Sequence, residues 1–558
     1  MKFSFRYLPA LLLILIILIA GFFRLYRIGE TPKGFYVDEA ALGYNAYSIL
    51  QTGKDEFGKS FPAMFRSFAT FQSPVYTYIT VPVIAVFGLN PLSVRLPSVI
   101  LGILTIPLLY FLVKKISTEK YGSILALIST FFLAVSPWHI AYSRTAYETN
   151  VALFLLILGS LMFFYALKRP WLFVASAIFY ALSFSAYRAE TLIVPVLVLA
   201  LAIGHYKELL AGKKTFIIPV IISFILGFVL VVPMLTIMRT PGFQARTSSL
   251  NILSSRQNPW GLKEDGSTLR RIVNIPQTLS AKEFFSLYSS YLSPRYMFQL
   301  GDSGPRKPYP DMGTFFPWLL LFYLAGLYFL IKEKDRKGLK IFTFVLLLIS
   351  PVPAALTRDP YSTLRALSLV IPQTILISFG LIKLWEIILP ALNKYKLLVL
   401  GILILFSSTQ MFISIFYLND HFTSTYWNYG WEQIAEEIPK LDTTLPVIVD
   451  GSRGDAYILM LFFMKYDPAI YQKDNFEVPL DEYYINMERN PTKNLGRITV
   501  KNFQWGIDTD HVDQYIVAEN IAIGPVQIAE HHLSIIKEVK LPNGDVAIRI
   551  LRTNPQSK

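Results

Sequence analysis

The sequence predicts a polytopic α-helical membrane protein with about eleven transmembrane helices, outer-face interfacial helices and a small C-terminal α/β domain. Three observations support this fold class. The 558-residue chain is 53% hydrophobic and only 16% charged, and its mean hydropathy is +0.45. Its apolar residues also come in blocks about one bilayer long. A soluble protein of this length does not carry such blocks.

The net charge of +14 comes from basic residues that fall in short clusters between the hydrophobic blocks. These clusters lie at Lys114 with Lys115, Lys168 with Arg169, Lys213 with Lys214, residues 332–340, and Lys394 with Lys396. Clusters so placed indicate membrane topology, and no nucleic-acid partner is predicted. The chain has no cysteine, which excludes disulfides, thiolate metal sites and cysteine nucleophiles.

The first apolar block, residues 8–23, follows Lys2 and Arg6 and lacks the small residues of a cleavage site. It predicts an uncleaved first span with a cytoplasmic N-terminus. Ten further blocks predict spans near 96–113, 121–137, 150–167, 171–187, 190–206, 215–237, 314–331, 340–356, 364–388 and 397–418.

Residues 75–89 are apolar but about half the usual spanning length, and Pro74 and Pro82 accompany them. Counting them as a crossing would place every later basic cluster outside. We therefore expect this segment to lie along the outer interface or to re-enter it. The transmembrane domain is then 1–418, with outer loops at 24–95 and 238–313, and the protein is expected in the cell membrane.

The composition after residue 418 turns soluble, which predicts an extracytoplasmic domain over 419–558. Asn543-Gly544 inside the run 539–551 predicts a β-hairpin. Short apolar runs separated by turn signals lie at 446–450, 457–463, 497–500 and 515–518. A small α/β fold is expected.

The first polar insertion carries two adjacent carboxylates, Asp38 and Glu39. Leu42, Ala46 and Ile49 follow at helical spacing, which predicts an amphipathic helix on the membrane surface. An aspartate at a helix start also fits a capping role. At a membrane rim the same pair suits an acid or base that acts on a lipid-borne substrate.

Two later segments add charge at the predicted outer ends of spans. Arg144 and Glu148 are four residues apart, which suits an exposed ion pair or the wall of a cleft that holds an anion. Arg358 and Arg365 can extend to lipid headgroups, or hold a lipid phosphate with their guanidinium groups.

Several nucleotide and metal motifs are missing. The sequence has no Walker A loop, no GxGxxG and no HExxH. Residues 508–511, Asp-Thr-Asp-His, match a DxD pattern that arises often by chance. No cofactor is predicted, and a divalent metal has no support in the sequence.

Residues 22 to about 150 resemble the family of C-type membrane glycosyltransferases (GT-C) that contains the protein O-mannosyltransferases and the aminoarabinose transferases. The likeness rests on the Asp38-Glu39 pair, on Ser73-Pro74-Val75-Tyr76, on Val94-Arg95-Leu96-Pro97-Ser98, and on residues 143–148. Relatives often carry Lys or His at the position of Ser73 and, in one branch, an acidic residue at that of Gln72. Metal or phosphate contacts known from that position are therefore not carried over.

The resemblance implies a GT-C fold and an inverting transfer of a sugar from a polyprenyl-phosphate donor to an acceptor on the outer face. It makes Asp38 the catalytic carboxylate, Glu39 a neighbour that helps to place the acceptor, and Glu148 a second acidic residue. The expected partners are the lipid-linked sugar, membrane lipids and an acceptor of unknown kind, lipid, glycan or protein. The expected substrate-binding residues are Tyr36, Arg95, Arg144, Arg188, Arg358 and Arg365.

Two other functions stay open. A polymerase or ligase of surface polysaccharide would use the long outer loop, which contains Arg239, Arg246, Arg256, Arg270, Arg271 and Arg295. A lipid or sugar transporter would place ionisable groups near the membrane midplane. The charges of this chain lie at the predicted ends of spans instead, which favours the transferase.

Overall fold

The computed structural model describes residues 7–68, 70–118, 121–211, 213–244, 276–304, 306, 309–358, 360–387, 393–452, 455–510 and 512–555. The chain forms two compact units. The first contains Met1–Tyr26, Ser98–Arg239 and Phe243–Ser414, and the second contains Arg27–Pro97, Thr240–Gly242 and Ile415–Lys558. The predicted first outer loop thus belongs to the same unit as the C-terminal residues.

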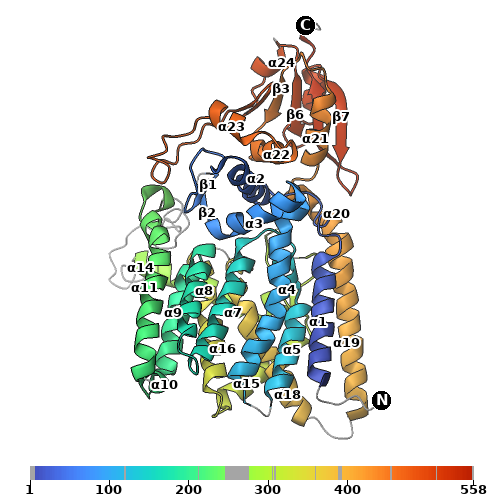
Figure 1. Cartoon of the computed structure of the whole chain (residues 1–558). Helices are drawn as coiled ribbons and strands as arrows, with labels where there is room; N and C mark the ends of the chain where they lie inside the picture. The colour runs from blue at the N-terminus through green and yellow to red at the C-terminus, as the bar shows by residue number, and fades with distance from the viewer. Residues whose placement is uncertain are drawn as a thin grey trace, which may run out of the picture. The chain divides into compact units, whose positions relative to one another are not determined.

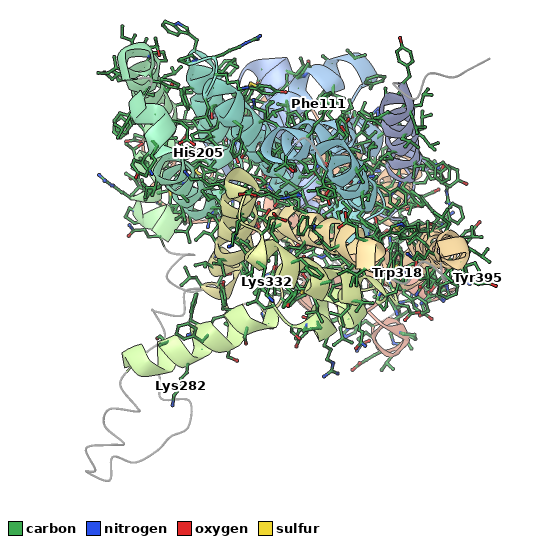
Figure 2. The ribbon with its side chains drawn as sticks, turned by 90° about the horizontal axis from the view of Figure 1, so that it is seen from below. Phe111, His205, Lys282, Trp318, Lys332 and Tyr395 are labelled. Carbon is green, nitrogen blue, oxygen red and sulfur yellow. The ribbon has the colours of Figure 1, made fainter. Side chains whose placement is uncertain are left out.

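The described elements of the first unit are helices. They are α1 (Leu8–Leu25), α5 (Gly122–Ala134), α6 (Pro137–Ser143), α7 (Glu148–Ala166), α8 (Leu172–Ala186), α9 (Glu190–Gly204), α10 (Tyr206–Ala211), α11 (Lys213–Met238), α14 (Pro276–Ser290), η3 (Tyr296–Leu300), α15 (Leu319–Lys332), α16 (Lys337–Ile349), α17 (Pro351–Ala355), η4 (Leu367–Leu369), α18 (Val370–Ile387) and α19 (Asn393–Ile413), together with most of α4 (Pro91–Ile116). Viewed along the helices, α14 with Lys282 lies apart from the main group (Figure 2).

The predicted spans coincide with helices of the structure. Seven described helices are long and apolar enough to cross a membrane, and α5 with α6 forms an eighth candidate, bent by 61°. The other three predicted spans coincide with the shorter apolar helices α8, α9 and α15. A fourth shorter apolar helix, Pro74–Phe87, is the segment expected along the outer interface, and the total of eleven crossings stays a prediction.

The helices of the first unit approach closely where glycine replaces a side chain. A Cβ on Gly326 of α15 would lie 1.8 Å from the carbonyl oxygen of Leu376 in α18. A Cβ on Gly380 of α18 would lie 1.8 Å from the carbonyl oxygen of Phe322 in α15. Such backbone contacts between small residues are typical of helix packing in membranes.

The second unit holds a six-stranded sheet with the strand order β4-β5-β3-β6-β8-β7 (Figure 1). Strand β3 is parallel to β5 and to β6, and the other pairs are antiparallel. The strands are β3 (Val447–Asp450), β4 (Lys493–Leu495), β5 (Ile498–Lys501), β6 (Tyr515–Glu519), β7 (Ser534–Lys540) and β8 (Val546–Arg552). Its helices are η6 (Ser414–Leu418), α20 (Asn419–Thr423), η7 (Ser424–Trp427), α21 (Trp431–Glu437), η8 (Ile438–Lys440), α22 (Ala456–Phe463), α23 (Pro468–Asp474), α24 (Ile507–Asp510) and α25 (Pro525–Glu530).

The predicted hairpin is present as β7 and β8, with Gly544 at φ +95° in its turn. Three of the four short apolar runs form strands, whereas residues 457–463 lie in helix α22. Seven residues of this helix are buried, so the run shows no polar face. An apolar run of this kind cannot be assigned to a helix or a strand from its periodicity.

The second unit also contains the helix predicted after the two carboxylates. It is α2 (Val37–Thr52), accompanied by β1 (Phe65–Ser67), β2 (Thr70–Gln72) and α3 (Pro74–Phe87). Ten residues of α2 are buried, so it is enclosed by the unit rather than exposed on one face as predicted. Gly43 explains the close packing, because a Cβ there would lie 2.6 Å from Phe462 of α22.

Candidate active site

The first turn of α2 is held by a buried ion pair between Glu39 and Arg95. Arg95 Nε donates to Glu39 Oε1 at 3.0 Å, and Arg95 Nη2 donates to Glu39 Oε2 at 2.9 Å. Arg95 Nη2 also donates to the carbonyl oxygen of Gly34 at 3.0 Å. Both side chains are almost completely buried. Glu39 and Arg95 therefore fix the loop and the helix start on which Asp38 lies.

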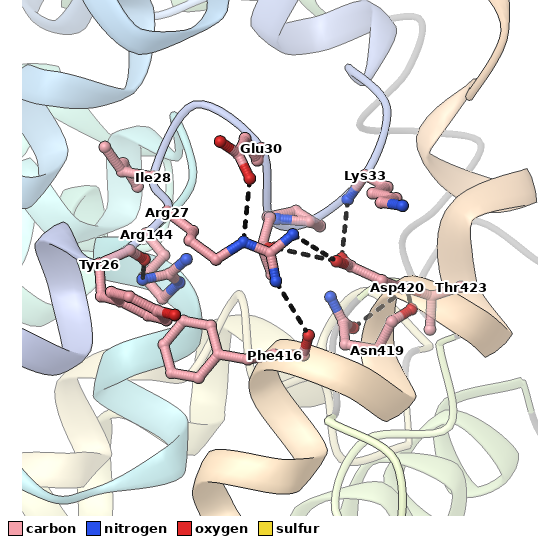
Figure 3. Close-up of polar contacts among 12 residues, drawn as sticks. Tyr26, Arg27, Ile28, Glu30, Lys33, Arg144, Phe416, Asn419, Asp420 and Thr423 are labelled. Carbon is pink, nitrogen blue, oxygen red and sulfur yellow. Dashed lines mark hydrogen bonds and ion pairs between the residues drawn. The ribbon is translucent and has the colours of Figure 1, made fainter. Parts of the chain in front are cut away.

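The loop before α2 is tied to α20 (Figure 3). Asp420 accepts hydrogen bonds from Thr31 Oγ1 at 3.0 Å and from the Lys33 backbone N–H at 3.1 Å. Arg27 Nη2 lies 3.9 Å from Asp420 Oδ2, and its Nε donates to Glu30 at 2.9 Å. One carboxylate of α20 thus holds three residues of this loop.

Gly34 and Trp427 bring the loop against η7. Gly34 has φ +97°, and a Cβ there would lie 2.3 Å from the carbonyl oxygen of Trp427. Only glycine fits this conformation and this approach. The ring of Tyr36, the residue before α2, lies edge-on to Trp427 at 6.3 Å between centroids. The backbone that carries Asp38 is therefore packed on both sides.

Asp38 itself is half-buried, in contrast to Glu39 beside it. Gln72 at the end of β2 reaches its backbone, with Nε2 donating to the Asp38 carbonyl oxygen at 3.5 Å. The other side-chain atom of Gln72, Oε1, is buried and has no hydrogen-bond partner within the described ranges. The surroundings of Asp38 thus hold a carboxylate that is partly open to solvent and a buried acceptor that can bind a hydroxyl group.

In the first unit, Arg144 closes the C-terminal end of α1. Its Nη1 donates to the carbonyl oxygens of Phe23 at 2.8 Å, Tyr26 at 2.9 Å and Arg24 at 3.3 Å. The side chain is buried, and its contact with Tyr26 is drawn in Figure 3. Cationic side chains commonly bind the last carbonyls of a helix. The structure gives Arg144 a role in holding α1.

Three other predicted residues of the first unit gather around Tyr187, which follows α8. Burial raises the pKa of Tyr187 above its usual range; Arg365 and Arg188 oppose the shift, and Glu148 and Glu190 add to it. Glu148 begins α7, and Glu190 begins α9. Four charges from separate elements therefore act on one hydroxyl group. We call the surroundings of Asp38 the first candidate region and this group of charges around Tyr187 the second.

Arg365 follows a segment that several side chains hold in place. Thr363 donates to Asp302 through its backbone N–H at 2.7 Å and through its hydroxyl at 2.8 Å. Because that hydroxyl donates to Asp302, the contact of 2.6 Å with Tyr142 has the Tyr142 hydroxyl as donor. Arg365 Nη1 donates to Thr357 Oγ1 at 2.8 Å.

The remaining predicted arginines differ in their surroundings. Arg358 lies at φ +58° and forms an ion pair with Glu283 of α14 at 3.2 Å, which neutralises its charge. The centre of the Arg188 guanidinium lies 4.2 Å from the centroid of the Phe243 ring. Arg246, Arg256, Arg270 and Arg271 lie outside the described residues. Among the residues that the structure does describe, no group of three or more His, Asp or Glu could hold a metal ion.

A sequence comparison finds that part of the chain is similar to a known family. Residues 72–237 match the family model described as dolichyl-phosphate-mannose-protein mannosyltransferase. The matching segment begins at Gln72 and includes Arg95, Arg144, Glu148 and Arg188. It confirms the resemblance for this part of the chain, and Asp38 lies before its first residue.

Two relatives and one solved structure extend the comparison. The proposed mannosyltransferases YkcB and YycA of Bacillus subtilis (strain 168) are 29% identical over 171 residues and 31% identical over 172 residues. Each match covers 30% of this chain but only 22% and 23% of the relatives' own length. ArnT from Cupriavidus metallidurans, solved bound to undecaprenyl phosphate, aligns over 97% of both chains with a TM-score of 0.50 and 11% identity.

At that identity the likeness to ArnT concerns the fold alone. Together with the apolar helices, it confirms that the chain is a multi-pass membrane protein with the GT-C fold. The predicted fold class is therefore correct.

Some residues that build the two regions gave no signal in the sequence. Asp420 and Trp427 lie almost 400 residues after the loop that they contact, in a stretch expected only to begin the soluble tail. Tyr187 lies at the end of the predicted span 171–187, and nothing in the sequence marks it as the centre of a group of charges. Gln72 was singled out only as a departure from the family pattern, and its hydrogen bond to the backbone of Asp38 was not expected.

Proposed function

We propose that the protein is an inverting glycosyltransferase that moves a sugar from a polyprenyl-phosphate donor to an acceptor on the outer face of the cell membrane. The match of residues 72–237 to the mannosyltransferase family carries this proposal. The fold shared with ArnT supports it, since ArnT was solved with undecaprenyl phosphate bound. A lipid-linked donor also suits an extracytoplasmic enzyme, because no pool of nucleotide sugars exists outside the cell.

Asp38 acts as the general base in this reaction. The acceptor hydroxyl or amine attacks the anomeric carbon of the donor sugar as the bond from that carbon to the phosphate oxygen breaks. The proton of the acceptor passes to the Asp38 carboxylate, and the bonding electron pair leaves with the polyprenyl phosphate. A single displacement inverts the anomeric carbon. The half-buried position of Asp38 fits a group that must meet a substrate, whereas Glu39 is fully engaged by Arg95.

The leaving phosphate requires cations rather than an acid. We assign this role to Arg365 and Arg188, whose charges act on Tyr187 together. A guanidinium group matches the oxygens of a phosphate with two parallel hydrogen bonds, and it stabilises negative charge as that charge develops. Arg358 is already paired with Glu283. Glu148 sits among the same charges and would orient the arginines.

Glu39, Arg95 and Arg144 hold the backbone in this proposal and do not contact substrate. Their side chains are buried and bind backbone carbonyls or each other. Tyr36 borders the start of α2 and is a candidate contact for the acceptor. We further propose that the N-terminus is cytoplasmic and that residues 419–558 are extracytoplasmic, as the basic clusters between the spans indicate.

The proposal is tested by a transfer assay with the full-length protein in nanodiscs. Lipid-linked sugars extracted from a producing strain serve as donors. Mass spectrometry then compares the lipid-linked sugars and surface glycans of cells with and without the protein, which identifies the product. Wild-type protein should consume a polyprenyl-phosphate sugar, and Asp38→Asn should not. Transport of lipid across vesicles with no transfer of sugar would overturn the proposal.

A further inference from the structure

A cavity of about 180 Å³ opens in the second unit, beside β3, β5 and the start of α22. The residues that give it chemical character are Asp455, Tyr457, Arg489, Asn490, Lys493 and Asn502. None of them belongs to either candidate region described above. Its volume is below the roughly 300–1,000 Å³ of pockets for drug-sized ligands and suits a single small ring.

The cavity lies where α/β sheets bind ligands. Parallel strands β3 and β5 end at Asp450 and Lys501, and the cavity lies just beyond these ends, against Gly451 and Asn502. Ligands of open α/β sheets occupy the crevice outside the carboxyl ends of the strands. In this chain the sheet places a cavity at that position with polar side chains around it.

The charges around the cavity compensate each other. Arg489 forms an ion pair with Asp455, and Lys493 forms an ion pair with the buried Glu477. Neither cation is therefore left to attract an anion, and the Asp455 carboxylate supplies an acceptor beside the donors. Two asparagine side chains add further donors and acceptors. This arrangement favours a neutral ligand that both donates and accepts hydrogen bonds.

The cavity is lined by one aromatic side chain, Tyr457. The Tyr457 ring stacks on the Tyr471 ring at 6.4 Å between centroids, and Lys493 Nζ lies 5.5 Å from the Tyr457 centroid. An aromatic ring next to paired polar groups is complementary to a pyranose ring, which has an apolar face and a rim of hydroxyl groups.

We infer that this cavity binds one neutral glycosyl residue of the acceptor and so selects glycan-bearing acceptors. The identification of the ligand as acceptor rests on the proposed function, whereas the binding of a glycoside does not. The ion pair between Arg489 and Asp455 and the amide of Asn490 would hold the hydroxyl groups, and Tyr457 would contact the ring.

The test measures binding without any donor, by saturation-transfer difference NMR on the full-length protein in nanodiscs. The probes are methyl α-D-mannopyranoside, methyl β-D-glucopyranoside and methyl 2-acetamido-2-deoxy-β-D-glucopyranoside, with sodium phosphate as the anionic probe. At least one glycoside should bind. Arg489→Gln and Asn490→Ala should each weaken binding about tenfold or more, as expected when hydrogen bonds to a ligand are lost.

Matched controls come from the same unit. Arg552→Gln removes another partly exposed arginine that is paired with an aspartate, Asp513, and Asn543→Ala removes an exposed asparagine from the β7–β8 turn. Both should bind like the wild type. The site is rejected if no glycoside binds, if phosphate binds in its place, or if Arg489→Gln and Asn490→Ala both bind like the wild type.

The outcome is separable from that of the transfer assay. Arg489-dependent binding of a glycoside by a protein that transfers no sugar would keep the cavity and remove the proposed reaction. Transfer of sugar by a protein that binds no glycoside would remove the cavity alone. If both hold, Asn490→Ala should raise the KM for the acceptor and leave the KM for the lipid-linked donor unchanged.

Discussion

Arg95 donates two hydrogen bonds to Glu39, from Nε to Oε1 at 3.0 Å and from Nη2 to Oε2 at 2.9 Å. Both side chains are almost completely buried. The two adjacent carboxylates at the start of α2 therefore differ in kind. Glu39 is a structural anion, and Asp38 next to it is half-buried and is the one that meets the substrate in our proposal.

Replacing Glu39 with Gln should destabilise the protein strongly. The change leaves the Arg95 charge buried without its partner, which typically costs about 3–5 kcal/mol. Thermal unfolding in detergent should show a large fall in Tm for Glu39→Gln and for Arg95→Met. Because the two residues form one pair, the double variant should lose much less than the sum of the single losses. Additive losses would contradict a direct coupling.

Replacing Asp38 with Asn should remove catalysis and preserve folding. Loss of a general base typically lowers turnover by about 10²–10⁴, and the half-exposed side chain makes few demands on packing. Donor-dependent transfer should fall by this amount at an unchanged Tm. Asp481→Asn, an exposed aspartate of the same unit, serves as the control. Near-normal turnover of Asp38→Asn would exclude Asp38 from the chemistry.

Replacing Asp420 with Ala should lower activity although Asp420 touches no substrate in our proposal. Thr31 and Lys33 would lose the acceptor that holds their loop, and Asp38 would lose its fixed position. We expect turnover to fall by about tenfold, which corresponds to a rise in the activation free energy about equal to the contribution of one hydrogen bond. Asp420→Asn keeps one acceptor oxygen and should recover part of the rate. A wild-type rate for Asp420→Ala would show that the loop does not need this contact.

The helices were predicted well from the sequence, because a helix that is buried in lipid appears as a continuous apolar block. The sequence could not show the contacts of Asp420 and Trp427 with the loop before α2, because these join residues almost 400 positions apart and a single sequence holds no record of such pairs. It also predicted α2 as a surface helix, because Ala40, Ala41 and Tyr44 around the helix were not recognised as buried. Local periodicity reports one helix face and not what surrounds the other faces.

Residue type and position identified Asp38, Glu148, Arg188 and Arg365 as charges at the predicted ends of spans. The sequence could not distinguish an arginine that faces a ligand from one that binds carbonyl oxygens. Arg95 and Arg144 belong to the second kind, and only their contacts show it.

Replacing Arg365 with Lys should weaken donor use more than acceptor use. Lysine keeps the charge but loses the planar pair of donors that suits a phosphate. We expect the KM for the lipid-linked donor to rise about tenfold and the KM for the acceptor to stay within about twofold of the wild-type value, consistent with the loss of one charge-assisted hydrogen bond. Arg358→Lys should have little effect on either, because Arg358 is paired with Glu283. A reversed order of the two variants would move the phosphate to Arg358.

The stability of the protein should fall as the pH rises from about 4.5 to about 8, and Glu56 should be the main cause. Burial raises the pKa of Glu56 from 4.5 to about 8; a hydrogen bond from Asn45 and the charge of Lys493 oppose the shift, and Asp55 adds to it. Between these two values the folded state keeps a proton that the unfolded state has released. The free energy of unfolding should then drop by about 1.4 kcal/mol per pH unit.

Two neighbours modify this pH profile. Burial raises the pKa of Asp55 to about 6, so it adds to the fall at the acidic end. Burial lowers the pKa of Lys493 from 10.5 to about 8. The stability that Lys493 contributes is therefore lost as the pH falls from about 10.5 to about 8, which lies above the pH range in which Glu56 acts. Glu56→Gln should flatten the profile and be more stable than the wild type at pH 9. Glu530→Gln, an exposed glutamate of α25, should leave the profile unchanged. A wild-type profile in Glu56→Gln would assign the pH dependence to another group.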